Sequence, residues 1–384
     1  MWRALASNMM TLLIVAAVML IAVIGWGQRS YVSTGPLDAP IFFEVPRGAS
    51  LTRVADALEA EGVISSATIF RLGAQYTEQA GDLKFGNYEL PAGASMAEVL
   101  DILTTGGAAS FRYVATYFIR VDSAETRLTE RSAGDGRAEV VASFAPEDPL
   151  PEPYAALVAA GTPMAHRISI AEGVTSWQIM DALQKADFLT GEISAVPAEG
   201  SLAPDTYEVE RGASRSAIVA RMAEAQTRIL AAAWEARDPE IPLDSAEEAL
   251  ILASIIEKET SVPEERDVVS SVFVNRLNRG MRLQTDPTVI YGITNGVGTL
   301  GRGLRRSELR GATPYNTYVI PALPPTPIAN PGRDAILAAV QPAETDYIFF
   351  VADGTGGHAF ARTLVEHNEN VARWREIERS RQAN

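Results

Sequence analysis

The sequence predicts an α+β fold: one N-terminal transmembrane helix, then small β/α units, then a mixed α+β domain. Three observations predict it. Residues 9–26 form an uncharged apolar segment. Further on, strand-like segments precede a glycine turn and a capped amphipathic pattern four times, and a longer capped helical pattern begins at Ser245.

Composition and charge limit the class of protein. The chain has 384 residues, of which 47% are apolar, enough for more than one hydrophobic core. Its 48 acidic and 33 basic side chains leave a formal net charge of −15. This disfavours generic nucleic-acid binding, because neutralising phosphates needs an excess of Lys and Arg. The absence of cysteine excludes disulfides, thiol catalysis, Cys-ligated zinc and iron–sulfur clusters.

The N-terminal segment from Met9 to Trp26 reads MMTLLIVAAVMLIAVIGW. As a helix it would be about 27 Å long, close to the thickness of a bilayer's hydrocarbon core. Two positive groups, Arg3 and the α-amine, precede the segment, and one, Arg29, follows it. This excess of positive charge favours an N-terminus on the cytoplasmic side. A cleaved signal peptide is the alternative, although its apolar core would be shorter, about 7–15 residues. Either way, we expect the chain after Ser30 to be exported, and we assign residues 1–30 to the cytoplasmic N-terminus and anchor.

One pattern occurs four times. It consists of a turn glycine, a Ser or Thr two residues later, and apolar residues six and ten positions after the glycine. It predicts a turn, a helix N-cap and one apolar helix face. Strand-like segments such as Ile41–Val45 and Tyr88–Leu90 come before it. Such units resemble the LysM-type fold, a glycan-binding module, but are also frequent in ordinary α+β architecture. The copies are Gly48/Ser50/Val54/Leu58, Gly93/Ser95/Val99/Leu103, Gly173/Thr175/Ile179/Leu183 and Gly212/Ser214/Ile218/Met222.

These units divide the first part of the chain. Residues 31–112 are predicted to form a LysM-like subdomain, and residues 166–244 a LysM-like or linking α+β segment. Residues 113–165 have a different composition: the apolar segments Tyr113–Val121 and Val140–Phe144 flank a polar stretch, and a segment rich in Pro and charge follows. This predicts an insertion or hairpin of unknown role.

Residues 245–384 are predicted to form the catalytic domain. Ser245 is a predicted N-cap, and its helix must end near Pro263 because proline disfavours helix in the residue before it. A second helix is predicted from Pro263 to a stop at Gly280. A strand at Tyr347–Val351, a glycine turn and a final polar helix follow.

Two glutamates near the end of the first of these helices face different ways. At about 100° per residue, Glu259 falls about 20° from Leu252 and continues the apolar stripe, whereas Glu257 points about 140° away. We therefore expect Glu257 to be a solvated or structural group. Burial and the negative end of the helix dipole would both raise the pKa of Glu259, as a general acid requires. The alternative is a buried glutamate paired with Arg266, Arg276 or Arg282.

Other motifs do not predict a cofactor. The sequence Gly-Val-Gly-Thr-Leu-Gly at 296–301 matches G-x-G-x-x-G, but it lacks the strand–helix context of a dinucleotide site. His358 and His367, with Glu366 or Glu369, lack the spacing of an H-E-x-x-H zinc site. No metal and no organic cofactor is expected.

Several long segments of the last third of the chain resemble the endolytic murein transglycosylases, the YceG-like family. The anchor, the LysM-like units and SLAPDTYEV at 201–209 extend the resemblance loosely over most of the chain, while residues 113–166 depart from it. The segments that carry it are ASIIEKET (Ala253–Thr260), SVFVNRLNRGMRLQTDPTVIYG (Ser271–Gly292), TPYNTY (Thr313–Tyr318), LPPTPIANPG (Leu323–Gly332) and YIFFVADGTGGHAF (Tyr347–Phe360).

The resemblance implies a peptidoglycan lytic transglycosylase with Glu259 as its catalytic acid/base, the residue that the helical face also selects. It implies cleavage between N-acetylmuramic acid and N-acetylglucosamine within glycan strands, leaving 1,6-anhydro ends and ending the elongation of nascent strands. We expect the substrate-binding residues to be Gln284, Thr285, Tyr315 and Asn316, each of which could instead order its loop. For Asp286 a structural role is expected.

The resemblance also implies a single-pass protein of the inner membrane with its catalytic domain in the periplasm. Its expected partners are glycan strands and the peptidoglycan synthases, the penicillin-binding proteins, and not nucleic acid. One alternative is a non-catalytic, LysM-like wall-binding or scaffold protein. Another is a hydrolytic muramidase, which needs a second carboxylate; Asp286 is the candidate.

Overall fold

The computed structural model describes residues 2–106 and 110–382. It confirms the α+β fold class. By their internal contacts the residues form two compact units. One comprises residues 1–115, 128–142 and 151–165, and the other residues 116–127, 143–150 and 166–384.

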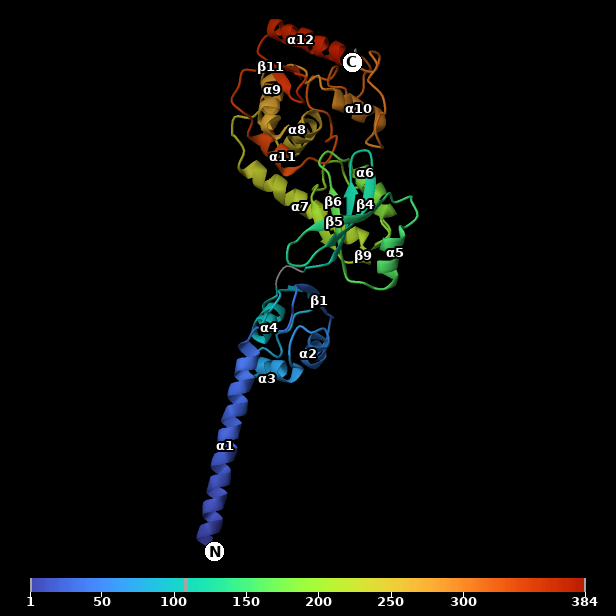
Figure 1. Ribbon diagram of the computed structural model, residues 1–384. Coiled ribbons are helices and arrows are strands. Elements are labelled where there is room, and N and C mark those ends of the chain that lie inside the picture. The colour runs from blue at the N-terminus through green and yellow to red at the C-terminus, as the bar shows by residue number, and fades with distance from the viewer. Residues whose placement is uncertain (1, 107–109, 383–384) are drawn as a thin grey trace. The chain divides into compact units, whose positions relative to one another are not determined.

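The first unit begins with helix α1 (Trp2–Val32). Its segment Met9–Val32 has a mean hydropathy of 2.6 and no buried portion, so it is long and apolar enough to cross a membrane. The C-terminal end of α1 packs against α3 and α4 (Figure 1), where the ring of Tyr31 lies directly on Gly73 and leaves no room for a Cβ atom. Composition and exposure of α1 are thus consistent with a membrane anchor.

A small β/α subdomain follows α1. Strands β1 and β2 are antiparallel, with Ile41 opposite Leu90, and the helices cover a core that contains Phe43, Leu58 and Phe70. The elements are β1 (Ile41–Val45), α2 (Leu51–Ala60), α3 (Ala67–Tyr76), β2 (Gly86–Leu90) and α4 (Met96–Thr105).

A five-stranded sheet has the strand order β5-β4-β3-β6-β8. Strand β4 could not be predicted from the sequence. Its buried residues, Thr126 and Leu128, alternate with charged residues, but threonine is polar, so the sequence does not show an alternation of apolar and polar residues. The strands are β3 (Tyr113–Ile119), β4 (Ala124–Arg131), β5 (Ala138–Phe144), β6 (Met164–Ile170) and β8 (Thr206–Val209), and helix α5 (Glu152–Ala159) lies between β5 and β6 in sequence.

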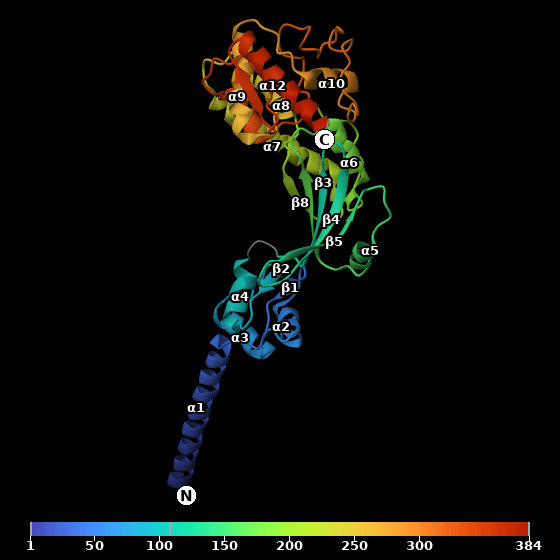
Figure 2. The same cartoon turned by 45° about the horizontal axis from the view of Figure 1, so that its top comes forward.

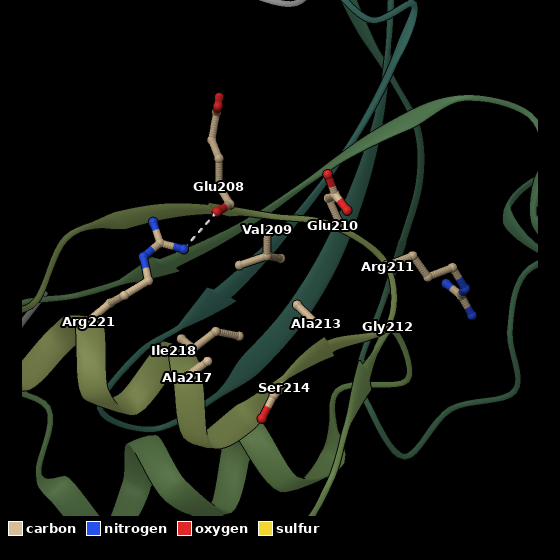
Figure 3. Close-up of a pocket in the computed structure, with 10 residues that line it drawn as sticks. All are labelled: Glu208, Val209, Glu210, Arg211, Gly212, Ala213, Ser214, Ala217, Ile218 and Arg221. Carbon is tan, nitrogen blue, oxygen red and sulfur yellow. Dashed lines mark hydrogen bonds between the residues drawn. The ribbon is translucent and has the colours of Figure 1, made fainter. Parts of the chain in front are cut away.

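All four glycine turns occur where the sequence predicts them. Each glycine has positive φ, between 68° and 89°, a conformation that favours glycine. The side chains of Ser50, Ser95 and Thr175 cap α2, α4 and α6 (Ser176–Lys185). In the fourth copy, which Figure 3 shows from Gly212 to Ile218, the Ser214 hydroxyl bonds to Ser216 instead of capping α7 (Arg215–Glu235).

The C-terminal part of the second unit is built around α8, which packs against α7, α9, α10 and α11 (Figure 1). Figure 2 shows α9 and α10 beside α8 from a second direction. Its apolar side, including Leu252, Ile255 and Ile256, is fully buried. The cap at Ser245 is confirmed. The elements are α8 (Ala246–Glu259), α9 (Arg266–Asn278), α10 (Asp286–Thr294), α11 (Arg333–Val340), the antiparallel β10 (Phe349–Ala352) and β11 (His358–Ala361), and α12 (Leu364–Gln382).

Two boundaries differ from the predicted ones, and two short strands were not predicted. The turn at Pro263–Glu265 is a 3₁₀ helix (η1), so the α-helix proper begins at Arg266. Strand β10 starts at Phe349, two residues later than expected. Two-residue strands, β7 (Leu189–Thr190) and β9 (Ala213–Ser214), pair in parallel and were not predicted, because two residues are too short for a periodic pattern.

Candidate active site

Glu259 is the last residue of α8 and is half-buried, so it keeps some accessible surface. Its carboxylate accepts a 2.9 Å hydrogen bond from the Thr285 hydroxyl. Burial raises the pKa of Glu259 above its usual value, and the nearby Asp286 carboxylate raises that pKa further. The Thr285 hydrogen bond and the charges of His358 and Arg276 act in the opposite direction. A carboxyl group of raised pKa with partial access to solvent can donate a proton to a bound ligand.

Glu257 lies on the other side of α8 and is also buried. Its side chain is 6% exposed and accepts a 2.9 Å hydrogen bond from the backbone N–H of Gly332, with Arg266 3.9 Å away. Of the two roles expected for Glu257, solvated or structural, the structure shows the structural one. A helical wheel places Glu257 away from the apolar stripe, but it does not reveal that residues from another segment cover that side.

None of the three arginines considered as a partner forms an ion pair with Glu259 within the described part of the chain. Arg266 bonds to Glu172 and Asp334. Arg276 donates to the backbone carbonyls of Ile348 and Leu283, and Arg282 donates to a carbonyl as well. The geometry therefore favours a carboxyl group that is not neutralised by direct pairing.

The loop before α10 contacts the Glu259 carboxylate through Thr285. Thr285 is only 1% exposed, and its N–H donates to the Thr317 hydroxyl at 3.0 Å while its own hydroxyl reaches Glu259. The Tyr318 hydroxyl donates to Asp286 at 2.7 Å. Thr317 and Tyr318 were not selected from the sequence, although both belong to the TPYNTY segment. Thr317 and Tyr318 contact residues 285 and 286, which lie 32 positions earlier in the sequence, and no local pattern predicts such a contact.

The other three residues expected to bind substrate lie in this region with different surroundings. Gln284 is exposed, with a φ of 50°. Tyr315 is half-buried, and its hydroxyl is 2.8 Å from that of Thr326. Asn316 is fully buried, its amide donating to three backbone carbonyls and its oxygen accepting from the Tyr318 N–H. The surroundings of Asn316 and Thr285 fit loop ordering and positioning of Glu259 better than contact with a sugar.

A histidine and a glutamate form a second feature beside Glu259. The Nδ1 atom of His358 is 2.7 Å from the Glu265 carboxylate. The same carboxylate accepts a hydrogen bond of 2.8 Å from the backbone N–H of His358. His367 instead stacks on Phe349, with ring centroids 5.0 Å apart. Within the described residues no group of three or more potential ligands could hold a metal. The glycine motif at 296–301 follows helix α10 rather than a strand, unlike a dinucleotide site.

Together these features define a class: an α+β protein with an apolar N-terminal helix and a C-terminal domain that presents a half-buried carboxyl group of raised pKa. The model of the YceG-like family matches residues 43–140 and 143–373. The chain belongs to the YceG-like family.

Relatives with assigned names are similar over most of this chain. The endolytic murein transglycosylase of Bacillus subtilis strain 168 is 29% identical over 332 residues, which cover 85% of this chain and 82% of that protein. The endolytic murein transglycosylase of Streptococcus pneumoniae D39 is 25% identical over 368 residues, and this chain spans 58% of its length. A crystal structure of a YceG-like protein from Listeria monocytogenes is 26% identical, with coverages of 86% and 99% and a TM-score of 0.43.

Substituting Glu259→Gln is expected to stabilise the fold at neutral pH. Because its folded-state pKa is raised, the Glu259 carboxylate costs stability once the pH exceeds the unfolded-state pKa, and the full cost applies above the folded-state pKa. The substitution should raise the melting temperature by about 2–4 °C at pH 7. The difference should disappear as the pH falls to about 4, the unfolded value. Thermal unfolding of both proteins across this pH range is the measurement, and an unchanged or lower melting temperature at pH 7 would contradict it.

Substituting Thr285→Val is expected to alter the pH dependence of activity. The lost hydroxyl stabilises the charged form of Glu259, so its removal raises the pKa of that carboxyl group further. The alkaline limb of the kcat/KM profile should then move to higher pH, and kcat should fall because the carboxyl group is less firmly held. Thr288→Val is the matched control, since the buried Thr288 hydroxyl bonds to Thr285 and Thr317 but not to Glu259. An equal shift in both variants would exclude this role for Thr285.

Proposed function

We propose that this protein is a membrane-anchored, endolytic peptidoglycan lytic transglycosylase that uses Glu259 as its acid/base. The observation that carries the proposal is the half-buried Glu259 carboxyl group, with its raised pKa and no pairing arginine within the described residues. Membership of the YceG-like family and the names of the relatives in Bacillus and Streptococcus support the substrate and the reaction.

In the proposed reaction, protonated Glu259 donates its proton to the glycosidic oxygen between N-acetylmuramic acid and N-acetylglucosamine. The C1–O bond of the muramic acid breaks, and the oxygen leaves as the hydroxyl of the next sugar. The C6 oxygen of the same muramic acid forms a new bond to C1, and its proton passes to the Glu259 carboxylate. Glu259 is thereby protonated again, and the new end is a 1,6-anhydro sugar. Because the nucleophile is part of the substrate, its proximity replaces a second catalytic carboxylate.

Asp286 is the observation that keeps a hydrolytic muramidase as the second candidate. Its carboxylate is exposed and lies in the electrostatic surroundings of Glu259, although it accepts a hydrogen bond from Tyr318. In a hydrolase it would activate water as the second carboxylate. The lytic reaction is favoured because the names of the relatives specify a transglycosylase.

The location and partners belong to the same proposal. Helix α1 would hold the protein in the inner membrane with its catalytic domain in the periplasm, and the segment Met9–Val32 is suited to this by length and composition. Glycan strands are the proposed substrate. The peptidoglycan synthases are the proposed partners, because an anchored enzyme beside the membrane would meet strands as they are made, and its cleavage would end their elongation.

The chemical nature of the product ends tests this function. The purified full-length protein would be incubated in detergent with peptidoglycan, and the soluble fragments analysed by chromatography with mass spectrometry. We expect internal fragments with anhydro ends, lighter by one water than reducing ends. Reducing ends would instead identify a hydrolase. Binding to the polymer without any cleavage would support a scaffold.

A further inference from the structure

A groove on the second unit runs from helix α6 to the first turn of α10. It consists of two adjoining pockets, with volumes of about 490 and 320 Å³. The two pockets have four lining residues in common. Two of these are joined by a hydrogen bond of 2.6 Å, from the Gln178 side chain to the Val121 carbonyl. The pockets therefore adjoin each other. The shared residues are Val121, Gln178, Gly298 and Thr299.

One end of the groove is lined by sequence neighbours of Glu259 and Asp286. Its lining includes Lys258, the residue before Glu259, and Pro287, the residue after Asp286. Asp286 and Pro287 form the first turn of α10, so this turn presents one residue to the groove and the other to the surroundings of Glu259. A polymer lying in the groove would approach the Glu259 carboxyl group at this end.

The walls of the groove are joined by buried hydrogen bonds. The Thr175 hydroxyl, at the N-cap of α6, donates to the Gly296 carbonyl at 2.6 Å. Glu199 accepts the N–H of Ser176 at 2.8 Å and the hydroxyl of Tyr291, on α10, at 3.2 Å. These bonds fix α6 relative to α10, and a preformed groove needs little reorganisation to bind a ligand.

Trp177 supplies an aromatic surface at the other end. It is half-buried on α6 and lines the larger pocket. Within the described part of the chain, the Trp177 ring does not stack on another aromatic ring, and its indole N–H does not donate a hydrogen bond. An indole ring that lines a pocket together with hydroxyl and carboxylate groups, here Ser123 and Asp122, suits a sugar ring, which has apolar C–H faces and polar edges.

The charges of the groove favour a neutral polar ligand over a polyanion. Lys185 pairs with Glu147 and Asp181, each at 2.9 Å. Arg302 pairs with Glu308, and the Lys258 ammonium donates to the Gly173 carbonyl at 3.1 Å. Since these cations already have partners, they offer little to a chain of phosphates.

We propose that this groove is a glycan-binding site. It binds a part of the strand that is distant from the bond being cleaved, and Trp177 stacks on one of its sugar rings. The inference rests on the proposed function for the identity of the polymer. Such a site lets the enzyme hold the middle of a strand, which endolytic cleavage requires.

Binding can be measured without cleavage in full-length protein that carries Glu259→Gln. The probe is the β-1,4-linked tetramer of N-acetylglucosamine, titrated by calorimetry. Trp177→Ala should weaken binding about 10-fold or more, whereas Trp177→Phe, which keeps an aromatic face, should stay within about 3-fold. Trp374→Ala, a half-buried tryptophan on α12 outside the groove, is the matched control and should bind as tightly as the parent.

With Glu259 intact, Trp177→Ala should raise KM for isolated glycan strands more than it lowers kcat. Undiminished tetramer binding by Trp177→Ala, or no binding by the parent, would overturn the groove as a glycan site. A wild-type protein that binds the tetramer through Trp177 but cleaves no strands would support the groove and reject the proposed function. Circular dichroism of each variant separates lost binding from lost folding.

Discussion

Glu259→Gln is expected to lower the rate of glycan-strand cleavage by about 10²- to 10⁴-fold, the usual contribution of a general acid/base. Glutamine is nearly the same size and can still accept the Thr285 hydrogen bond, but it has no proton to give to the leaving oxygen. The measurement is the rate of appearance of anhydro-ended fragments from purified peptidoglycan. This variant should combine loss of activity with the gain of stability described above, because one half-buried carboxyl group supplies the proton and, when charged, costs stability.

Glu257→Gln is the matched control for this substitution. Glu257 is two residues away on the same helix and is also buried, and glutamine can still accept its hydrogen bond from Gly332. We expect this variant to keep most of the wild-type cleavage rate. Equal losses in the two variants would mean that the end of α8 matters only for folding. Full activity of Glu259→Gln would reject the assignment of the acid/base.

Arg215→Ala is expected to destabilise the second unit by about 3 kcal/mol and to lower its melting temperature by about 6–12 °C. The buried Arg215 guanidinium, on the first residue of α7, donates to four backbone carbonyls. Three of them, on Leu183, Gln184 and Ala186, lie at the C-terminal end of α6, where carbonyls run out of helical donors. The fourth is on Gly191. Alanine would remove all four hydrogen bonds. The carbonyls of Leu183 and Ala186 would keep only long backbone hydrogen bonds, of 3.3 and 3.4 Å, from Ala186 and Leu189.

Arg221→Ala tests whether this effect depends on position. Arg221 is on the same helix but exposed, and donates to the Glu208 carbonyl at 3.1 Å (Figure 3). Its removal should change the stability by no more than about 0.5 kcal/mol. Thermal unfolding of the two variants beside the wild type is the measurement. Similar melting temperatures for Arg215→Ala and the wild type would show that water replaces the guanidinium.

Local features could be predicted from the sequence because residues close in the chain carry them. Four glycines with positive φ precede helix starts, and Ser245 caps α8, as their patterns indicate. The helical period placed Glu259 on the apolar side of α8, and in the structure it is half-buried, but the period did not predict that Glu257 is covered as well. The apolar segment of α1 was evident from composition alone. The polar β4 was missed, because its buried face includes a threonine.

The sequence by itself thus determined the α+β class, the apolar N-terminal helix, the capped turns and the place of Glu259 on the apolar side of α8, since helical periodicity and capping act within a few residues. Only the tertiary structure decided what surrounds that carboxyl group: the Thr285 hydroxyl, 26 residues further along the chain, and the absence of a pairing arginine among the described residues. It also showed the burial of Glu257 and the groove that begins at Trp177. These depend on the packing of segments far apart in sequence, for which no local pattern exists.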